Sequence, residues 1–230
     1  MQRMSQAEFQ ALTAGAATLS ADEHGPKVLQ TPGGRVIKLF RRKRLLSSTL
    51  LVPYARRFER ASQRLAALDI PAARVERVAR VPSIHRDIVI YPHVPGISLR
   101  EALAGADDKQ SLLRALAQLF VRLHERGVYF RAAHFGNFLV QPSEEPAVRL
   151  ALVDLSEARF RRGELAPAMR ARNFKPMTRY REDLDAVRSF GADRFITAYL
   201  DSARLDAANA QRFREALGNI DEAFNFASAN

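Results

Sequence analysis

The sequence predicts an α+β chain of two lobes, and three observations support this prediction. Short β-like runs around one helical segment fill the first part of the chain, up to Tyr91. Residues 92–96 (PHVPG) then interrupt regular structure, because each proline removes a backbone donor. Beyond this stretch the sequence is mostly helical, with one hairpin-like segment. Because separate runs of strands and helices typically pack as separate layers, we expect lobes at residues 1–91 and 92–230.

The first lobe is predicted to be rich in strands. Pro32-Gly33-Gly34 separates two β-like runs and is typical of a tight turn. Between residues 53 and 68 the apolar side chains recur at helical spacing, and Pro71 ends that helix. The strands that we expect here are residues 27–31, 35–40, 74–81 and 87–91.

The second lobe is predicted to be mostly helical. One apolar stripe ends at Gly127, which is typical of a helix C-cap, and consists of Leu112, Leu116, Leu119, Phe120 and Leu123. Two short apolar runs, residues 138–140 and 150–155, flank a polar segment and predict a hairpin. The tail is predicted to be helical again, with one apolar face formed by Phe213, Leu217, Ile220 and Phe224.

Composition excludes several classes of protein. With 230 residues and 47% hydrophobic content, the chain can bury a substantial core. It contains no cysteine, which excludes disulfides and thiolate metal sites. His124-Glu125 does not continue into a paired-histidine zinc motif. There is no apolar run of membrane-spanning length and no apolar segment near the N-terminus, so we expect a cytoplasmic protein.

The net charge of +11 predicts attraction to anionic partners. Arginines cluster at residues 41–44, 159–162, 170–172 and 179–181. Anionic lipid and phosphorylated substrates would both suit such a surface, and solvation by many surface arginines is an equally good explanation. Nucleic acid is not expected as a partner, because the sequence has no recognisable binding motif and no strand platform of aromatic and basic residues.

Lys38 and Glu59 are the first candidates for chemistry. Lys38 lies within the predicted strand V-I-K-L-F, and Glu59 lies in the helix that follows. Phosphoryl transfer needs a cation on the nucleotide phosphates, and a strand lysine held by a helix glutamate supplies one. The alternative is that Lys38 is a surface lysine on a strand and that Glu59 is one of several charges on an amphipathic helix, because both would give the same sequence pattern.

The segment from Leu123 to Ser156 resembles the protein-kinase superfamily. R-A-A-H-F-G-N is similar to the catalytic loop H-R-D-x-x-x-x-N, with Arg131 and Asn137 in matching positions. L-V-D-L-S places Asp154 where the metal-binding aspartate of the D-F-G motif stands. The resemblance covers residues 12 to 190. It implies a two-lobed protein-kinase-like fold with a reduced C-lobe.

The resemblance also implies the cofactors, ATP and Mg²⁺, and the residues that hold them. Lys38 would hold the nucleotide phosphates and Glu59 would hold Lys38. Asn137 and Asp154 would hold magnesium. Gly25 stands in the phosphate-covering loop, which has few other glycines.

Among kinase-like families, the sequence is most similar to the bacterial lipopolysaccharide kinases. H-G-P-K-V-L, V-I-K-L-F and H-F-G-N-F-L-V carry this resemblance, together with the small size of the chain. These kinases phosphorylate heptose or 3-deoxy-manno-octulosonic acid of the core oligosaccharide. The resemblance therefore implies a core sugar as acceptor, and a basic surface that meets the anionic cytoplasmic face of the inner membrane as a peripheral protein.

The sequence departs from the family pattern at the acceptor end of the loop. Ala132 replaces the aspartate that orients the substrate hydroxyl, Phe130 replaces the preceding histidine, and Ser156 replaces the glycine of D-F-G. His134 is close enough in sequence to act as the base instead, or it braces the loop. The alternative function is a pseudokinase that keeps the fold as a binding or regulatory module.

Asp183 and Asp185 open the helix that follows the last arginine cluster. One of them would brace the catalytic loop, as a helix aspartate does in related kinases. The alternative is that both complement the helix dipole.

Overall fold

The structure is a computed structural model that describes residues 1–41, 52–106, 108–145 and 147–218. The chain divides into two compact units. The first comprises Met1–Val94 with Asp154–Glu157, and the second comprises Pro95–Val153 with Ala158–Asn230.

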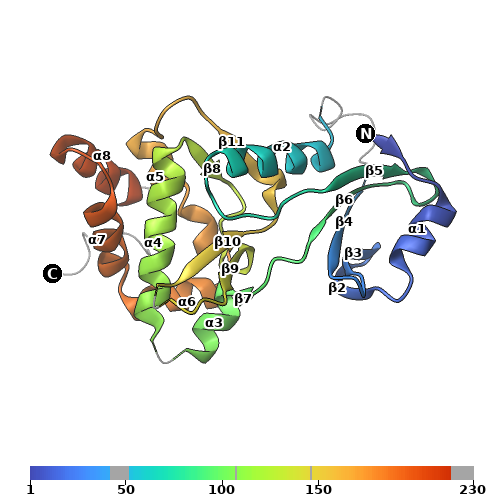
Figure 1. Cartoon of the computed structure of the whole chain (residues 1–230). Helices are drawn as coiled ribbons and strands as arrows, with labels where there is room; N and C mark the ends of the chain where they lie inside the picture. Colours follow the sequence, from blue (N-terminus) through green and yellow to red (C-terminus); the bar gives the residue numbers. More distant parts are fainter. Residues whose placement is uncertain (42–51, 107, 146, 219–230) are drawn as a thin grey trace. The chain divides into compact units, whose positions relative to one another are not determined.

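The first unit is built on a six-stranded sheet with the order β1-β5-β6-β4-β3-β2 (Figure 1). β1 runs parallel to β5, and the other neighbouring strands pair antiparallel. The strands are β1 (Gln2–Arg3), β2 (Ala17–Asp22), β3 (Gly25–Gln30), β4 (Arg35–Arg41), β5 (Arg77–Val81) and β6 (Arg86–Pro92). The helices are α1 (Gln6–Thr13), α2 (Tyr54–Ala67) and the short 3₁₀ turns η2 (Pro82–Ile84) and η4 (Leu155–Glu157).

Both faces of this sheet are covered. Side chains alternate along β4, so that Ile37 points to the face that Phe9 of α1 covers. Phe40 points to the opposite face, where its ring lies 6.2 Å from Phe58 of α2. Phe58 also stacks on Tyr91 of β6, with the ring centroids 5.6 Å apart. A sheet covered on both faces explains why β6 is an almost unbroken apolar run.

The predicted strands and the predicted helix of this unit are confirmed. β3 and β4 form the expected hairpin across Pro32-Gly33-Gly34, and α2 begins and ends within one residue of the expected bounds. The sequence reading assigned no element before residue 25, where the structure has β1, α1 and β2. Every residue of β2 is exposed, so this strand has no apolar alternation to reveal it.

The second unit combines two small sheets with most of the helices (Figure 1). The sheets have the strand orders β10-β9-β7 and β11-β8. The strands are β7 (Ile97–Ser98), β8 (Val128–Phe130), β9 (Phe138–Gln141), β10 (Arg149–Leu152) and β11 (Ala158–Phe160). The helices are α3 (Leu99–Gly105), α4 (Lys109–Glu125), α5 (Pro167–Arg172), α6 (Arg181–Phe190), α7 (Ala192–Ser202) and α8 (Ala207–Gly218), with 3₁₀ turns at η3 (Phe135–Asn137) and η5 (Lys175–Thr178).

A cluster of aromatic rings forms the centre of the helical core. Phe174 lies 4.7 Å from Phe120 of α4 in an edge-to-face arrangement, which is a favourable geometry for two rings. The rings of Phe195, Tyr199 and Phe213 also lie within 6 Å of Phe174. The apolar stripe predicted for α4 is buried, and β9 and β10 form the predicted hairpin. In the tail, Phe213 and Leu217 are buried as expected, whereas Ile220 and Phe224 lie outside the described residues.

Two glycines allow close approach of the backbone. Gly127 follows the end of α4 with φ +70°, as the predicted C-cap requires, and a Cβ there would overlap the carbonyl oxygens of Arg161 and Gly163. Gly96 has φ +126°, and a Cβ there would overlap the carbonyl oxygen of Val140. Larger residues would therefore separate these segments.

In the part of the chain that the structure describes, no helix is long and apolar enough to cross a membrane. Of the first predicted arginine cluster, only Arg41 is described, and residues 42–44 lie outside the described residues.

Candidate active site

Lys38 lies in the middle of β4, in the first unit, and its side chain is 15% exposed. It points to the same face of the sheet as Phe40, because side chains two residues apart share a face. Its ammonium group lies 2.8 Å from a carboxylate oxygen of Asp154 and 5.8 Å from the Phe40 ring. The strand therefore holds a cation against the carboxylate that the sequence identified as a metal ligand.

Asp154 adopts an unusual backbone conformation with φ +55°, in the left-handed region. For a residue other than glycine this conformation costs energy, and such strain is typical of functional sites. Its carboxylate is held on both oxygens: Oδ2 by Lys38 and Oδ1 by the hydroxyl of Ser156 at 3.2 Å. Burial, and then the charge of Asp154, raise the pKa of Tyr91. The contacts with Lys38 and Ser156 thus fix the orientation of the Asp154 side chain.

The expected pair between Lys38 and Glu59 is not formed in this structure. Glu59 instead accepts a 2.6 Å hydrogen bond from Arg56, which lies three residues earlier in α2. Residues at this spacing are neighbours on a helix surface, so the local pair forms readily. The carboxylate beside Lys38 comes from Asp154, which directly precedes η4, the 3₁₀ turn that packs against α2.

Gly25 begins β3, directly after the short loop that joins β2 and β3. Its φ of +101° suits glycine and strains other residues. The loop is held at both sides: Asp22 accepts a hydrogen bond from the backbone N–H of His24, and Arg86 donates to the carbonyl oxygen of His24. Gly25 therefore sets the shape of this hairpin.

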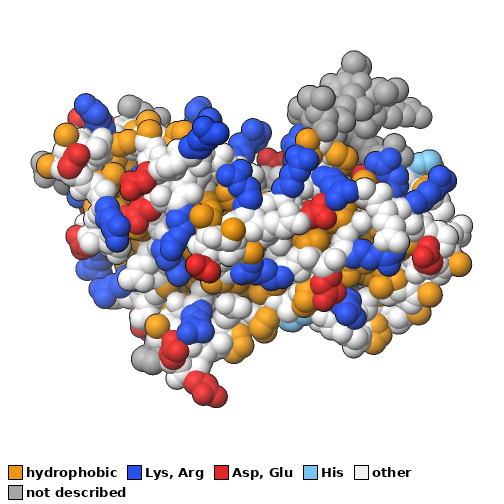
Figure 2. All heavy atoms as spheres, turned by 45° about the horizontal axis from the view of Figure 1, so that its top comes forward, with side chains coloured by type: hydrophobic (Ala, Val, Ile, Leu, Met, Phe, Trp, Pro, Cys, Tyr) orange, Lys and Arg blue, Asp and Glu red, His pale blue; other side chains and the backbone are white. Residues whose placement is uncertain are grey.

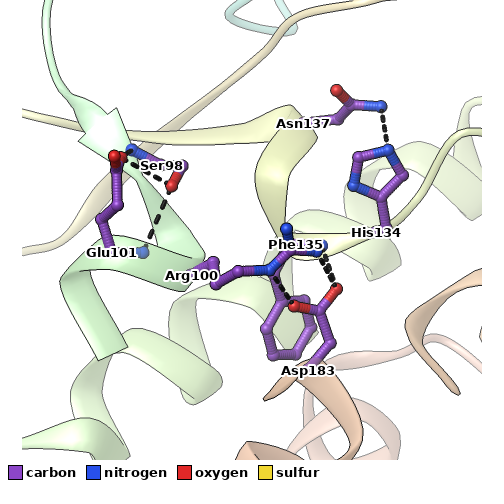
Figure 3. Close-up of polar contacts among 7 residues, drawn as sticks. All are labelled: Ser98, Arg100, Glu101, His134, Phe135, Asn137 and Asp183. Atoms are coloured by element: carbon purple, nitrogen blue, oxygen red, sulfur yellow. Dashed lines mark hydrogen bonds and ion pairs between the residues drawn. The ribbon is translucent and has the colours of Figure 1, made fainter. Parts of the chain in front are cut away.

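Asn137, in the second unit, is nearly buried, and its side-chain amide is oriented by two contacts, of which Figure 3 shows the one with His134. Nδ2 donates to the carbonyl oxygen of Ala132 at 2.9 Å and lies 3.0 Å from Nε2 of His134. A carbonyl oxygen only accepts, so the nitrogen of the amide must face Ala132. Oδ1 therefore remains available as a ligand. The backbone carbonyl of Asn137 accepts from Val153, the residue before Asp154.

His134 faces Asn137 through one ring nitrogen and Tyr180 through its ring. Because Nδ2 of Asn137 is the donor, Nε2 of His134 is the acceptor in this contact. Its ring meets Tyr180 edge-to-face at 5.0 Å. These contacts support the expectation that His134 braces the loop. Beside it, Arg131 is exposed and Ala132 is partly buried, and both lie in the turn that follows β8.

Asp183 is the aspartate that braces this loop. It is fully buried, and it accepts a hydrogen bond from the backbone N–H of Phe135 at 2.9 Å. Arg100 donates to both of its oxygens, from Nε at 2.7 Å and from Nη2 at 3.0 Å (Figure 3). Asp185 is exposed and lies 3.7 Å from Arg181 on its own helix. The structure thus decides which of the two predicted aspartates reaches the loop.

A second buried brace was not found from the sequence. Asn173 accepts from the backbone N–H of Phe130 at 3.0 Å and donates to its carbonyl oxygen at 2.7 Å. His124 lies behind it, with Nε2 3.3 Å from Asn173 and Nδ1 2.9 Å from the hydroxyl of Tyr199. Asn173 therefore fixes the strand end from which Arg131 and Ala132 emerge.

The environment of His124 keeps it neutral. Burial lowers the pKa of its imidazole to about 3; the hydrogen bond with Asn173 opposes this shift and the charge of Arg170 adds to it. Arg170 is itself buried and is held by Glu164 at 2.7 Å and by the hydroxyl of Tyr199 at 3.3 Å. A sequence shows a lone histidine in an apolar stripe, and does not show which distant side chains surround it.

The available donors fit magnesium. Mg²⁺ prefers hard oxygen ligands and is usually held by one or two carboxylates together with phosphates of the substrate. Asp154 offers a carboxylate and Asn137 offers an amide oxygen. Among the described residues there is no group of three or more histidine, cysteine or acidic side chains that could hold a metal by itself.

Comparison with known protein families identifies the chain. The profile of the "Lipopolysaccharide kinase (Kdo/WaaP) family" matches residues 34–199, well over half of its length. The chain belongs to this family. The match includes Lys38, Asn137 and Asp154, and it begins after the hairpin of Gly25. Membership supports a kinase-like phosphotransferase. No match was found among curated proteins.

This lipopolysaccharide kinase family member is similar to solved structures. One is WaaP in complex with acyl carrier protein, with a TM-score of 0.53 and 17% identity, and the match covers 94% of this chain and 98% of that chain. Another is a double mutant of the PknI kinase domain from Mycobacterium tuberculosis, with 18% identity, 92% coverage of each chain and a TM-score of 0.45. The family match and the first of these structures confirm the α+β kinase-like fold predicted from the sequence.

Proposed function

We propose that the protein is a phosphotransferase that uses ATP and Mg²⁺ to phosphorylate a sugar hydroxyl of the lipopolysaccharide core. The observation that carries this proposal is the 2.8 Å ion pair between Lys38 and the strained residue Asp154. A cation and a fixed carboxylate held together on one face of a sheet are the groups that organise nucleotide phosphates and their metal.

Each residue has a role in this proposal. Lys38 neutralises charge on the phosphates. Its ammonium group donates a hydrogen bond to a phosphate oxygen, and it either keeps its ion pair with Asp154 or exchanges it for the phosphate. Asp154 and Asn137 hold Mg²⁺ through carboxylate and amide oxygens. When bound, the metal offsets the negative charge that develops as the terminal phosphoryl group leaves. Ser156 keeps the Asp154 carboxylate oriented, and Asp183 and Asn173 hold the loop that carries Asn137.

The loop has no carboxylate at position 132 to accept the proton of the acceptor hydroxyl. Ala132 ends in a methyl group, which neither accepts a proton nor orients a hydroxyl. Loss of a general base typically costs about a hundredfold to ten-thousandfold in rate. Phosphoryl transfer depends mainly on positioning and electrostatics, so the remaining residues support slow transfer.

A ligand-dependent shift in stability tests the nucleotide site. Mg-ATP at about a hundred times its dissociation constant should stabilise the protein by about 2.7 kcal/mol, which calorimetry detects readily. Lys38→Met should remove most of this shift. Lys27→Met is the matched control, because Lys27 lies on the adjacent strand and its side chain is half exposed. An equal shift in the wild type and in Lys38→Met would contradict the proposed role of Lys38.

Ala132 favours a second candidate function, that of a pseudokinase. If the base is the missing element, Ala132→Asp should raise the rate of transfer, or of ATP hydrolysis, about tenfold or more. Binding of Mg-ATP without turnover in either protein would favour the pseudokinase. Wild-type turnover that Ala132→Asp leaves unchanged and His134→Ala abolishes would assign the base role to His134.

We further propose that the protein works at the cytoplasmic face of the inner membrane as a peripheral protein. Figure 2 shows Lys and Arg side chains scattered over the face drawn there. Exposed arginines in the second unit include Arg159, Arg161, Arg162, Arg172, Arg179 and Arg181. Binding to anionic vesicles should therefore be strong at low salt and should disappear near 1 M salt, where charges are screened within a few ångströms. Binding that survives 1 M salt would contradict an electrostatic attachment.

A further inference from the structure

A two-stranded ribbon directly precedes the loop of the candidate site. β8 begins three residues after α4 ends, and it pairs with β11 in an antiparallel register in which Tyr129 lies opposite Arg159 (Figure 1). Val128 and Phe130 are buried, whereas Tyr129 is partly exposed and Arg159 is exposed. Because side chains alternate along a strand, Tyr129 and Arg159 share the outward face of this ribbon.

Further arginines lie where this ribbon meets the end of α4. Arg161 follows β11, and its backbone N–H donates to the carbonyl oxygen of Gly127, so the two segments lie side by side. Arg122 and Arg126 lie four residues apart at the end of the helix, where side chains at this spacing are neighbours. Burial, and then the charge of Arg126, lower the pKa of Arg122. We call the exposed arginines of these segments the basic patch, which consists of Arg122, Arg126, Arg159, Arg161 and Arg162.

The protein itself does not neutralise the basic patch. In the part of the chain that the structure describes, none of the arginines of the patch lies within ion-pair distance of a carboxylate. Two acidic side chains next to the patch are engaged elsewhere: Glu125 accepts a hydrogen bond from the backbone N–H of Arg204, and Glu164 binds the buried Arg170. Like charges at helical spacing repel each other, and an anionic partner would relieve this repulsion.

The position of the basic patch favours a bilayer as this partner. Residues 131–137, which form the loop of the candidate site, continue directly from β8. A surface at this point that binds lipid phosphates would hold the loop against the membrane in which a lipopolysaccharide acceptor is anchored. Tyr129 suits this setting, because tyrosine is enriched at membrane–water interfaces, where its ring contacts apolar groups and its hydroxyl contacts water.

We propose that the basic patch and Tyr129 form the surface by which the protein docks on anionic lipid headgroups, and that docking brings the loop of residues 131–137 to the bilayer. This inference rests on the proposed function, because it assigns the peripheral attachment to one surface of the second unit. The attraction falls off within about a Debye length, which is about 10 Å at about 0.1 M salt. Basic side chains that do not face the bilayer therefore contribute little.

Charge removal at two places in the second unit tests this surface. Arg126→Gln combined with Arg161→Gln removes two charges of the basic patch and leaves the backbone hydrogen bonds of both residues in place. Lys109→Gln combined with Arg114→Gln is the matched control, because it removes the same charge from exposed positions of α4 that lie about 18 Å or more from Arg126 along the helix.

Co-sedimentation with vesicles of phosphatidylcholine and phosphatidylglycerol at low salt measures the binding of both double variants. The patch variant should raise the dissociation constant for these vesicles about tenfold or more. The control variant should bind nearly as the wild type does. Equal weakening in the two variants would show that binding follows net charge alone, and would overturn the inference.

Fluorescence tests which surface meets the bilayer. The chain contains no tryptophan, so Tyr129→Trp introduces a single probe at the basic patch. Brominated phosphatidylcholine, mixed with phosphatidylglycerol, should quench the emission of this probe when the protein binds. Gln110→Trp, at an exposed position in the first turn of α4, is the control and should be quenched much less. Equal quenching of the two probes, or none at Tyr129→Trp on bound vesicles, would overturn the inference.

Three other results separate this inference from its alternatives. A wild type that phosphorylates core oligosaccharide and does not bind anionic vesicles would refute the docking surface and leave phosphate transfer standing. Vesicle binding that depends on the basic patch, without any transfer, would refute the transfer and leave the docking surface standing. Duplex DNA that displaces the protein from vesicles, and that binds the patch variant more weakly than the control variant, would assign the patch to nucleic acid and overturn the inference.

Discussion

The buried histidine His124 gives a prediction whose size follows from the structure. Its imidazole is fully buried between Asn173 and Tyr199, and burial lowers its pKa to about 3. In the unfolded chain, a histidine has a pKa of roughly 6.5. Between these two values the unfolded chain binds a proton that the folded chain does not, so acid favours unfolding.

The stability that neutral His124 contributes is fully present only above about pH 6.5. Below that pH, the free energy of unfolding should therefore fall as the pH falls. Each pH unit within the window is worth about 1.4 kcal/mol. At pH 5, about 1.5 units below the unfolded value, the loss due to His124 should be roughly 2 kcal/mol. Titration of carboxylates adds its own pH dependence, so the effect must be isolated with a variant.

His124→Gln removes the titrating group and keeps a polar side chain. Urea unfolding, followed by circular dichroism between pH 7.5 and pH 5, measures the free energy of both proteins. The variant is expected to be less stable at pH 7.5, and its disadvantage should shrink by roughly 2 kcal/mol at pH 5. His93→Gln, at an exposed position, controls for the loss of a histidine as such. Parallel pH profiles for the wild type and His124→Gln would refute this reasoning.

Three further substitutions test the supports of the site. Asn173→Ala leaves the backbone N–H and C=O of Phe130 without their partner, and should lower the free energy of unfolding by at least about 2 kcal/mol in urea titrations. An unchanged midpoint would show that water or another side chain replaces Asn173. Gly127→Ala places a Cβ on a residue with left-handed φ and against the carbonyl oxygens of Arg161 and Gly163. The free energy of unfolding, measured by thermal unfolding, should therefore fall by more than about 1 kcal/mol. Stability equal to that of the wild type would mean that Arg161 and Gly163, which follow β11, move away from residue 127 without lowering the free energy of unfolding. Ser156→Ala removes the hydroxyl that orients Asp154, and should raise the Mg²⁺ concentration needed for half of the ATP-dependent thermal shift. The same Mg²⁺ dependence in both proteins would assign Ser156 no role in the metal site.

Local patterns in the sequence predicted most of the fold. The apolar stripe of α4 and the spacing in α2 follow the period of a helix, and the hairpin of β3 and β4 follows from a proline–glycine turn. Each signal lies within a few residues of the element that it predicts. The motif around Asn137 and Asp154 was found for the same reason, since its spacing is local.

Polar contacts between distant residues could not be predicted in this way. Arg100 and Asp183 are 83 positions apart, and only the folded chain shows that they share a buried ion pair. Glu59 illustrates the same limit, since its sequence position is compatible with Lys38 or with Arg56. The structure selects Arg56, because that side chain lies one helical turn away.

The central claim, that this family member transfers phosphate, is tested most directly by following the labelled terminal phosphate of ATP. Incubation with purified core oligosaccharide should yield labelled core, in a reaction that requires Mg²⁺ and is about a hundredfold or more slower in Lys38→Met. No labelled core from a wild-type protein that binds Mg-ATP, or labelling that Lys38→Met leaves unchanged, would contradict the claim.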